Sequence, residues 1–339
     1  MGMDSGLPTQ RYFKNKRILV TGAGGFIGSH LTEALLDISA AVRAFVHYNS
    51  RNDWGFLEEL PAKDKSEIDV IAADLRDFHA VKQATKGVDI VFHLGASIGI
   101  PYSLAYPSDV VETNVMGTLN VLKSTLENGT SRVIHTSTSE VYGTAQYVPI
   151  DEKHPLSPQS PYAATKVAAD KLAEAFFRSY GLPTSIIRPF NTFGPRQSLR
   201  AIIPTIITQL LRGEKIRIGN LKPRRDFTYI SDTVQGFILL ARKSGIEGDT
   251  FNLGTSKDIS IKELIYLISR IMGVTPQFKI DRRRVRGNQS EVMQLLSDNS
   301  RAVKILGWNP ANTLEEGLRK TIDWLREKRN FGKPWTYNI

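Results

Sequence analysis

The stretch Thr21-Gly-Ala-Gly-Gly-Phe-Ile-Gly28 follows a short apolar run and opens an amphipathic run with helical spacing. Gly22 permits a tight turn, Gly25 lets the backbone approach a pyrophosphate, and Gly28 allows close packing of the helix on the preceding strand. Free N–H groups at the start of the helix attract phosphate charge. Because further strand–helix units follow, the stretch predicts a bound dinucleotide cofactor. The expected contacts are Gly22, Gly25, Phe26, Ile27 and Gly28.

Around this turn, the first half of the chain alternates short apolar runs with longer amphipathic ones, which is typical of βαβ units on a parallel sheet. The expected strands are 17–21, 41–46, 68–72, 89–94, 132–137 and 184–188. The expected helices between them are 26–36, 78–85, 108–127 and 161–180. Ser160 and Pro161 suit the start of the last helix, and Gly181 suits its end.

From about residue 194 the alternation loosens, and helical runs are separated by short strands and loops rich in proline and glycine. These helical runs are 201–211, 231–243, 261–271 and 314–326. We therefore expect an α/β protein with a Rossmann doubly wound parallel sheet and a smaller mixed α/β substrate-binding lobe on the C-terminal side. The expected division is 1–190 with about 228–255 for the Rossmann domain, and 191–227 with 256–339 for the lobe.

Composition excludes several classes of protein. The 339 residues are 41% hydrophobic and 23% charged, as in ordinary globular proteins, and none is cysteine. Disulfides, thiolate nucleophiles and cysteine metal sites are therefore excluded, and no metal site is predicted. The first residues contain no apolar run, and 201–211 is too short and too broken by Pro204 to span a bilayer. We expect a cytoplasmic protein without a membrane partner.

The formal net charge of +10 raises the question of nucleic acid. The basic residues cluster late in the chain, but no helix-turn-helix, zinc-finger or RNP motif accompanies them. A solvated basic face explains most of them, and a pocket for a diphosphate needs several arginines in any case. We therefore predict no nucleic-acid partner.

The residues after the second expected strand bear on the choice between NAD and NADP. No carboxylate stands there before Asp53, whereas Asn49, Ser50 and Arg51 could bind a 2′-phosphate, which favours NADP. Arg51 is equally compatible with an ordinary loop residue. Other expected cofactor contacts follow the third and fourth strands, at the adenine and at the pyrophosphate or nicotinamide ribose. They are Asp74, Leu75, Leu94, Ala96 and Ser97.

Tyr162 and Lys166 stand four residues apart near the start of a helix and share one face. A phenol, with a reference pKa near ~10, is a poor base at neutral pH, and a nearby ammonium group favours the phenolate. Such a pair suits removal of an alcohol proton as hydride leaves for a nicotinamide. Thr138, Ser139 and Glu140 follow the fifth expected strand, where Thr138 could donate to the reacting oxygen and Glu140 could act as a general base.

At these residues the chain resembles the extended short-chain dehydrogenase/reductases, in the NAD(P)-dependent sugar-nucleotide epimerase/dehydratase branch. The Thr138-Ser-Glu140 triplet resembles GDP-mannose 4,6-dehydratases and UDP-glucuronate decarboxylases alike. Segments 45–54 and 194–209 look most like bacterial dehydratases acting on N-acetylglucosamine nucleotides, such as those of legionaminic acid synthesis. The motifs carrying the resemblance are 21–28, 93–96, 114–118, 137–142, 162–166, 188–191, 194–196, 225–232, 251–254, 290–292 and 298–300.

The resemblance implies a nucleotide-sugar 4,6-dehydratase with a tightly bound, recycled cofactor. Tyr162 would deprotonate the C4 hydroxyl with support from Thr138 and Lys166, and Glu140 would take the C5 proton. Ser139 stands where relatives usually have aspartate, so either Ser139 or Glu140 would assist departure of the C6 hydroxyl. A homodimer through 108–127 and 161–180 is also implied. The implied substrate contacts are Asn191, Arg225 and Arg286.

Three alternatives remain at this point. A UDP-glucuronate decarboxylase fits the same triplet, and a 4-epimerase is disfavoured by Glu140. A non-catalytic dinucleotide sensor on the same scaffold is the third, and it would not need the tyrosine–lysine pair. The sequence does not fix the nucleotide or the sugar.

Overall fold

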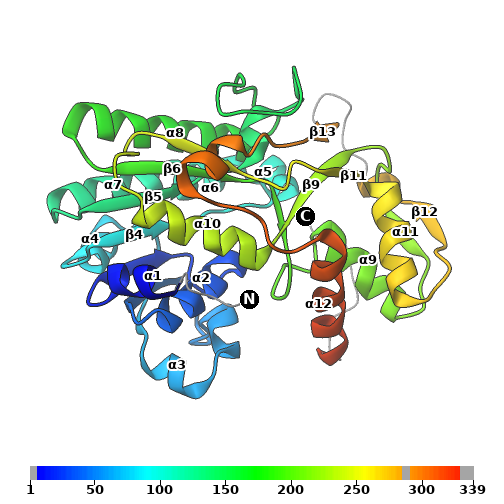
Figure 1. Ribbon diagram of the computed structural model, residues 1–339, viewed down its shortest axis with the longest axis horizontal. Helices are drawn as coiled ribbons and strands as arrows, with labels where there is room; N and C mark the ends of the chain where they lie inside the picture. The colour runs from blue at the N-terminus through cyan, green and yellow to red at the C-terminus, as the bar shows by residue number, and fades with distance from the viewer. Residues whose placement is uncertain (1–5, 285–290, 329–339) are drawn as a thin grey trace.

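A computed structural model describes residues 6–284 and 291–328, and its centre is a seven-stranded parallel sheet (Figure 1). The strand order is β10-β6-β5-β4-β1-β2-β3, and every neighbouring pair is parallel. This is an α/β fold with a Rossmann-like sheet, as the alternation predicts. The strands are β1 (Arg17–Thr21), β2 (Ala41–His47), β3 (Asp69–Ala73), β4 (Ile90–His93), β5 (Arg132–Thr136), β6 (Thr184–Pro189) and β10 (Thr250–Leu253).

The strand order reverses between β1 and β4, because the chain builds outward from β1 through β2 to β3 and then returns to the other side of β1. In open α/β sheets, ligands bind beyond the carboxyl ends of the strands at such a reversal. The glycine-rich turn at the end of β1 therefore lies beside the crevice expected for a cofactor.

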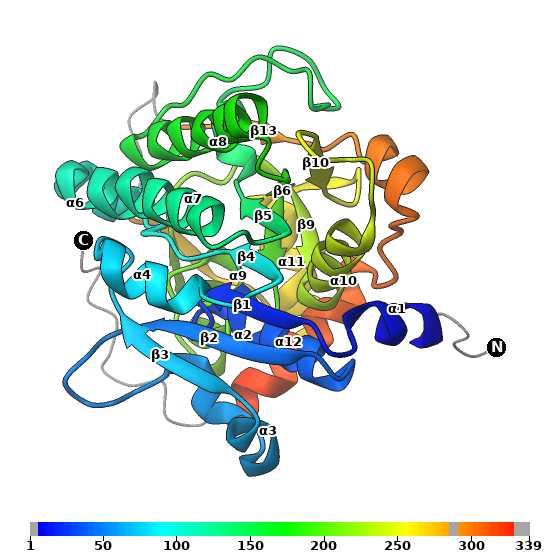
Figure 2. The ribbon, with the colours of Figure 1, turned by 90° about the vertical axis from the view of Figure 1, so that its left-hand side faces the viewer.

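Helices cover both faces of this sheet (Figure 2). One face carries α2 (Phe26–Asp37) and α10 (Ile230–Arg242), which contact each other. The other carries α4 (Phe78–Thr85), α7 (Gly117–Glu127) and α8 (Pro161–Tyr180). The short helix α1 (Gly6–Phe13), which the sequence did not predict, is tied to the α10 side by a hydrogen bond from the Tyr12 hydroxyl to the Ala241 carbonyl, 3.0 Å.

The helix predicted over 108–127 forms as a continuous helical run over 107–127, but it contains a π-helical turn that the sequence did not predict. The segment is α6 (Pro107–Val111), a π-helical turn η2 (Glu112–Met116) and then α7. The π turn is closed by a bond from the Gly117 N–H to the Glu112 carbonyl, five residues back. It carries Asn114, whose buried side chain makes hydrogen bonds outside its own helix. The π turn therefore coincides with long-range hydrogen bonds, which no local sequence pattern predicts.

After β6 the chain leaves the large sheet and builds smaller ones before returning to it with β10. In the second sheet β9 (Arg224–Tyr229) pairs with β7 (Asn191–Phe193), β11 (Asp258–Ser260) and β13 (Gln294–Leu295). A third sheet pairs β8 (Ile216–Ile218) with β12 (Phe278–Ile280). The helices α9 (Ile202–Leu211), α11 (Ile261–Met272) and α12 (Leu314–Glu327) contact one another beside these strands. The domain boundaries given above stay a prediction.

The remaining helices are short, and none was predicted as a separate element. They are η1 (Gly55–Glu59), α3 (Ala62–Ser66), α5 (Ile100–Ala105), η3 (Ser139–Tyr142), η4 (Arg282–Arg284) and η5 (Ala302–Leu306). Within the described ranges, no helix is both long and apolar enough to cross a membrane.

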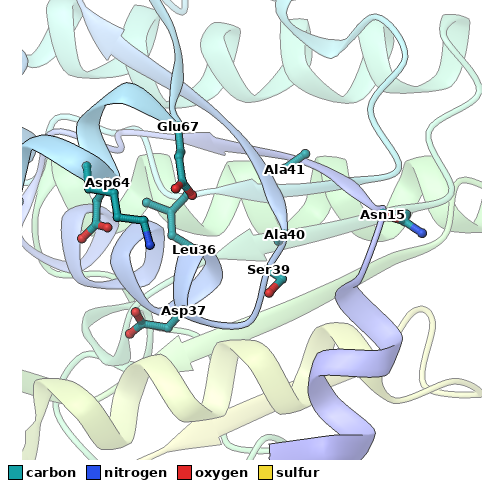
Figure 3. Close-up of a pocket in the computed structure, with 9 residues that line it drawn as sticks. Asn15, Leu36, Asp37, Ser39, Ala40, Ala41, Asp64 and Glu67 are labelled. Carbon is teal, nitrogen blue, oxygen red and sulfur yellow. The ribbon is translucent and has the colours of Figure 1, made fainter.

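A polar pocket lies at the opposite edge of the large sheet from the glycine-rich turn, where β1 and β2 begin (Figure 3). Asp37, Asp64 and Glu67 line it with Lys63 and Asn15. In the part of the chain that the structure describes, no three His, Cys, Asp or Glu residues are grouped to hold a metal ion. Because the pocket lies where β1 and β2 begin, it is remote from the carboxyl ends of the strands, where the active site is expected.

Candidate active site

The glycine-rich turn joins the carboxyl ends of β1 and β4. Gly22 has a φ of +70°, and a Cβ atom there would lie 2.9 Å from the Gly95 backbone after β4. A Cβ atom on Gly28 would lie 2.1 Å from the Gly22 carbonyl oxygen, so only glycine fits. No side chain caps α2 at Gly25, which leaves N–H groups at the start of α2, beside Phe26 and Ile27, for phosphate oxygens. This cradle fits a dinucleotide pyrophosphate.

The loop after β2 packs directly on this turn. The Phe56 N–H donates to the Gly24 carbonyl at 2.9 Å, and a Cβ atom on Gly24 would lie 2.4 Å from the Trp54 carbonyl oxygen. The loop therefore stands where the adenosine end of a cofactor on the turn would lie.

Within the loop, the Asn49 side chain is used internally. Its carbonyl oxygen accepts from the N–H groups of Arg51 and Asp53, and its amide donates to the Asp53 carbonyl at 2.7 Å. Ser50 is exposed, and the Arg51 side chain is 82% exposed with its guanidinium 3.8 Å from the Asp53 carboxylate. Arg51 and Ser50 are thus open to a ligand, whereas Asn49 mainly shapes the loop.

Asp74 and Leu75 follow β3, but their side chains have structural partners. The Asp74 carboxylate accepts from Arg76 at 2.6 Å, and this hydrogen bond lowers the pKa of Asp74. Leu75 is buried in the core, and its side chain packs against Gly95 and Gly117. A contact of these two residues with adenine stays a prediction.

Residues after β4 line the same edge of the sheet. The N–H groups of Leu94 and Gly95 donate to the Thr21 hydroxyl at 3.1 and 3.0 Å, which fixes the end of β4 to the end of β1. Ala96 and Ser97 follow, and the Ser97 backbone is held on both sides by Asn114. The predicted cofactor residues of β1 and β4 therefore meet in one place.

The tyrosine and lysine lie on α8, whose bounds match the prediction. The Ser160 hydroxyl accepts from the Ala163 N–H at 3.1 Å at one end, and Gly181 adopts φ +68° at the other. Tyr162 and Lys166 lie one turn apart and are both buried, on the face of α8 that turns inward. The caps and the spacing are both local, so the sequence predicted this element well.

Burial sets the ionisation of both groups. It raises the pKa of Tyr162, which a hydrogen bond with Thr138 opposes, and the charge of Glu140 raises it further. Burial also lowers the pKa of Lys166 to about 8, although the charge of Asp170 acts in the other direction. The expected effect of a nearby ammonium group therefore does not outweigh burial, and the phenolate is not favoured in the protein alone.

Thr138 and Glu140 come from the turn after β5. Thr138 caps η3, and its hydroxyl accepts from the Glu140 N–H at 3.2 Å. Its contact with Tyr162, and the effect of Glu140 on the same phenol, show that the structure brings these three residues together. Ser139 is buried at 3% exposed, whereas Glu140 is partly open. Glu140 is thus the more accessible acid or base.

Two of the three predicted substrate residues lie on neighbouring strands of the second sheet. Asn191 pairs with Phe227, two residues from Arg225, and its buried side-chain oxygen has no hydrogen-bond partner among the described residues. Arg225 is buried and donates to the Arg224 carbonyl at 2.9 Å. The buried Asp226 accepts from Thr255 and Ser297 and so fixes this part of β9. Arg286 lies outside the described residues.

Asn114 lies in one of the motifs that carry the resemblance, and the sequence predicted no role for it. Its side-chain oxygen accepts from the Ser97 N–H at 2.7 Å, and its amide donates to the Ser97 carbonyl and to the Thr165 hydroxyl, 2.9 Å. It thus ties the predicted cofactor edge of β4 to the helix that carries Lys166. The feature of the sequence that could have indicated this role is an asparagine within a run of helical spacing.

Comparison with known proteins identifies a family of enzymes whose solved members bind NAD and nucleotide sugars. The family described as GDP-mannose 4,6 dehydratase matches residues 19–321. The chain belongs to this family. It is an extended short-chain dehydrogenase/reductase, and an enzyme of the nucleotide-sugar dehydratase and epimerase superfamily.

Relatives within this superfamily carry both activities. The chain is 34% identical to a UDP-glucuronate 4-epimerase of Thermodesulfobacterium geofontis, over 91% of this chain and 96% of the relative. The solved UDP-N-acetylglucosamine 4-epimerase of Methanobrevibacter ruminantium has a TM-score of 0.84 and 31% identity, covering 93% and 99% of the two chains. The dTDP-glucose 4,6-dehydratase of Streptomyces venezuelae, solved with NAD bound, has a TM-score of 0.82 and 30% identity, covering 93% and 98%.

Proposed function

We propose that this enzyme is a nucleotide-sugar 4,6-dehydratase, which converts an NDP-hexose to the 4-keto-6-deoxy sugar. The observation that carries the proposal is the position of Glu140, close enough to Tyr162 for its charge to act on the phenol. A simple oxidation and re-reduction at C4 needs Tyr162 but no second base. A partly open carboxylate near Tyr162 supports a further proton transfer.

In the proposed reaction, Tyr162 accepts the C4 hydroxyl proton while Thr138 donates a hydrogen bond to the same oxygen. A nicotinamide bound beside the glycine-rich turn would supply the hydride chemistry at C4 and at C6. The positive charge of an oxidised nicotinamide would also favour the Tyr162 phenolate, which burial alone disfavours. Lys166 adds a second positive charge on the same helix face.

Once C4 is a ketone, the C5 proton is acidic and Glu140 removes it. The C6 hydroxyl then leaves as water, and Glu140 supplies the proton that it has just taken. Ser139 is too buried to be the first choice for this proton, since its side chain is only 3% exposed. Hydride addition at C6 and protonation at C5 complete the product. The C5 proton comes from solvent, to which Tyr162 gives up the C4 hydroxyl proton, so one water is lost and no cofactor is consumed.

For the substrate, we propose that Asn191 and Arg225 hold the nucleotide diphosphate, with Arg286 as a third contact. The unpartnered buried oxygen of Asn191 and the buried arginine on the neighbouring strand support this assignment. An N-acetylglucosamine nucleotide is the sugar class that we favour, on the resemblance of segments 45–54 and 194–209.

For the cofactor, we propose NADP in preference to NAD. The exposed Arg51 beside the glycine-rich turn supports this choice, because a guanidinium pairs well with a phosphate. The Asp53 carboxylate, 3.8 Å from Arg51, acts against it, and solved relatives are described with NAD. The preference therefore depends on Arg51 turning to the ligand.

We also propose a homodimer through the segment from α6 to α7 and through α8. Exposed apolar side chains on this side of the molecule, among them Val111, Met116 and Tyr180, support an interface. A dimer mass by light scattering at micromolar concentration is the expected result, and a monomer mass contradicts it.

The activity is tested by incubating the enzyme with a panel of UDP-, GDP-, CDP- and dTDP-sugars and measuring product masses. Loss of one water from one member is the expected result. A 4-epimerase, which the epimerase relatives favour as the second candidate, gives a changed sugar of unchanged mass. Carbon dioxide released from UDP-glucuronate identifies a decarboxylase. Cofactor binding with no product from any member contradicts the proposed dehydration of these sugar nucleotides.

A further inference from the structure

A buried cluster of charged and polar side chains lies behind the catalytic pair. Asp170 stands one turn after Lys166 on the same face of α8 and is fully buried. Arg188 on β6 and His135 on β5 reach it from the sheet. A fully buried ion pair is expensive to form, so its position next to a catalytic lysine calls for an explanation.

The contacts around Asp170 are well defined. One carboxylate oxygen accepts from the Ser137 hydroxyl at 2.8 Å and from the Arg188 guanidinium at 2.9 and 3.2 Å. The other lies 3.2 Å from His135 Nε2. Although burial raises the pKa of Asp170, His135 and the charge of Arg188 hold it below its ordinary value. The carboxylate is therefore an anion.

The same cluster reaches the turn that carries Thr138 and Glu140. Arg188 donates from its remaining nitrogen to the Tyr142 hydroxyl at 2.9 Å, and its guanidinium lies over the Tyr142 ring. The Tyr142 hydroxyl donates in turn to the Asn252 side chain on β10 at 2.7 Å. Tyr142 is the last residue of η3, which Thr138 caps. One continuous set of buried bonds therefore links the two catalytic segments.

We propose that Asp170 is a positioning residue for the catalytic pair. Its carboxylate is the buried counter-charge of Lys166, and through Arg188 and Tyr142 it holds α8 in register with the 138–142 turn. The inference rests on the proposed roles of Tyr162 and Lys166. It goes beyond them by explaining how a fully buried lysine keeps its charge.

The charged and titratable groups around Lys166 come from four elements. Asp170 is the only charge found to act on the lysine itself among the described residues, and it favours the ammonium form. The other groups in the cluster are Tyr162 on α8, His93 on β4, His135 on β5 and Arg188 on β6. Burial lowers the pKa of both histidines, so they remain neutral neighbours at neutral pH. If Asp170 loses its negative charge, none of these groups therefore supplies another negative charge to Lys166.

The test is direct titration of Lys166 by NMR of ¹³C-labelled lysine, with the signal assigned by its absence in Lys166→Met. In Asp170→Asn, Lys166 is expected to titrate about one pH unit or more below its position in the unaltered protein. Ser137→Ala is the matched control, because it removes a hydrogen bond to the same carboxylate but leaves the charge. It should leave the Lys166 titration in place. An unmoved Lys166 in folded Asp170→Asn overturns the proposal.

If Asp170→Asn does not fold, the double variant with Arg188→Met removes both charges of the Asp170–Arg188 ion pair, so that no buried guanidinium is left without its carboxylate. The downward shift of Lys166 is expected there too, and its absence overturns the proposal equally. None of these titrations needs a sugar nucleotide, so they are readable even if the panel above gives no product. If it does give one, the alkaline limb of the rate profile moves down in Asp170→Asn with the Lys166 titration.

The positional part is tested with Tyr142→Phe, which removes the hydroxyl between Arg188 and Asn252. The expected result is about a tenfold lower rate of nicotinamide reduction, with the Lys166 titration unchanged, since displacement of reacting groups by a fraction of a bond length is costly. An unchanged rate shows that the link to the 138–142 turn is structural only and overturns that part of the proposal.

Discussion

Glu140 is the residue on which dehydration, as opposed to reversible oxidation, depends. Glu140→Gln keeps the shape of the side chain and removes its basicity. Mixing this variant with substrate should still reduce the nicotinamide, while product formation falls by about 10²-fold or more. The measurement pairs absorbance of the reduced cofactor with product mass. Tyr162→Phe is the companion variant and should abolish both signals. Full turnover by Glu140→Gln contradicts a dehydratase.

Arg51 is the residue on which the choice of NADP depends. Arg51→Ala removes the only guanidinium of the loop after β2, and it should weaken NADP binding by about ten- to a hundredfold, since hydrogen bonds between charged groups contribute ~1.5–3 kcal/mol. NAD binding should change little. Calorimetric titration after removal of bound cofactor measures both. Asp53→Asn, which removes the carboxylate beside Arg51, should strengthen NADP binding. If the unaltered enzyme prefers NAD, the proposal is wrong.

For single residues, the sequence predicted which side chains belong to the site better than it predicted the residues that they contact. Tyr162 and Lys166 share a face because helix geometry is local, and Thr138 and Glu140 follow from the end of a strand. The partners of Asn114 and Asp170 depend on which strands are neighbours in the sheet, and one sequence does not reveal that order. The internal use of Asn49 and the pairing of Asp74 with Arg76 were missed for a similar reason, since turn geometry decides them.

Among the elements, those with strong local signals were predicted best. The bounds of α4 and α8 match the prediction, because aspartate or serine caps start them and glycine or a loop ends them. The six predicted strands of the large sheet all form: β1 has the predicted bounds, and the other five differ by one residue at one or both ends, as apolar runs mark them. The seventh strand, β10, was not predicted. The π turn η2 and the short strands of the second sheet were not located, because tertiary contacts and pairing partners form them.

The packing of the glycine-rich turn against α2 predicts the effect of a substitution at Gly28. Gly28→Ala places a methyl group 2.1 Å from the Gly22 carbonyl, so the turn and α2 must separate. We expect cofactor binding to be lost and the free energy of unfolding to fall by ~1–3 kcal/mol. Gly129→Ala is the control, since its φ is +68° but nothing lies within 4 Å of the added atom. It should cost ~1 kcal/mol and leave cofactor binding intact. Normal cofactor affinity in Gly28→Ala argues against this site.

In the whole molecule, contacts between distant segments connect the cofactor turn to the second sheet. The His30 Nε2 atom on α2 lies 3.0 Å from the Pro195 carbonyl, and Glu33 pairs with Arg196 at 2.8 Å. Both partners follow β7, which carries Asn191. The helix that begins at the glycine-rich turn is therefore attached to the strand region proposed for the substrate. Neither contact was predictable from the sequence, since 163 or more residues separate the partners.

The same central region predicts how stability depends on pH. His93 and His135 are buried at the centre of the sheet, and burial lowers the pKa of each, that of His93 to well below its ordinary value. In the unfolded chain a histidine titrates near ~6.5. Below that pH the unfolded state binds protons that the folded state does not bind. The contribution to stability is therefore complete above about pH 7 and is lost as the pH falls.

The expected loss is up to ~1.4 kcal/mol per pH unit for each such histidine, measured by urea unfolding at pH 7.5, 6.5 and 5.5. Most aspartates and glutamates act at lower pH, because their reference pKa values lie near ~4. Burial raises the pKa of Asp37, Glu152 and Asp226, but these residues are the same in the unaltered protein and in a histidine variant, so the difference between the two slopes reports the histidine. His93→Gln can still bond to Thr21 or Thr118 but does not titrate, so its slope should be smaller by about one proton. An equal slope in the variant would mean that His93 accepts its proton while the sheet stays folded.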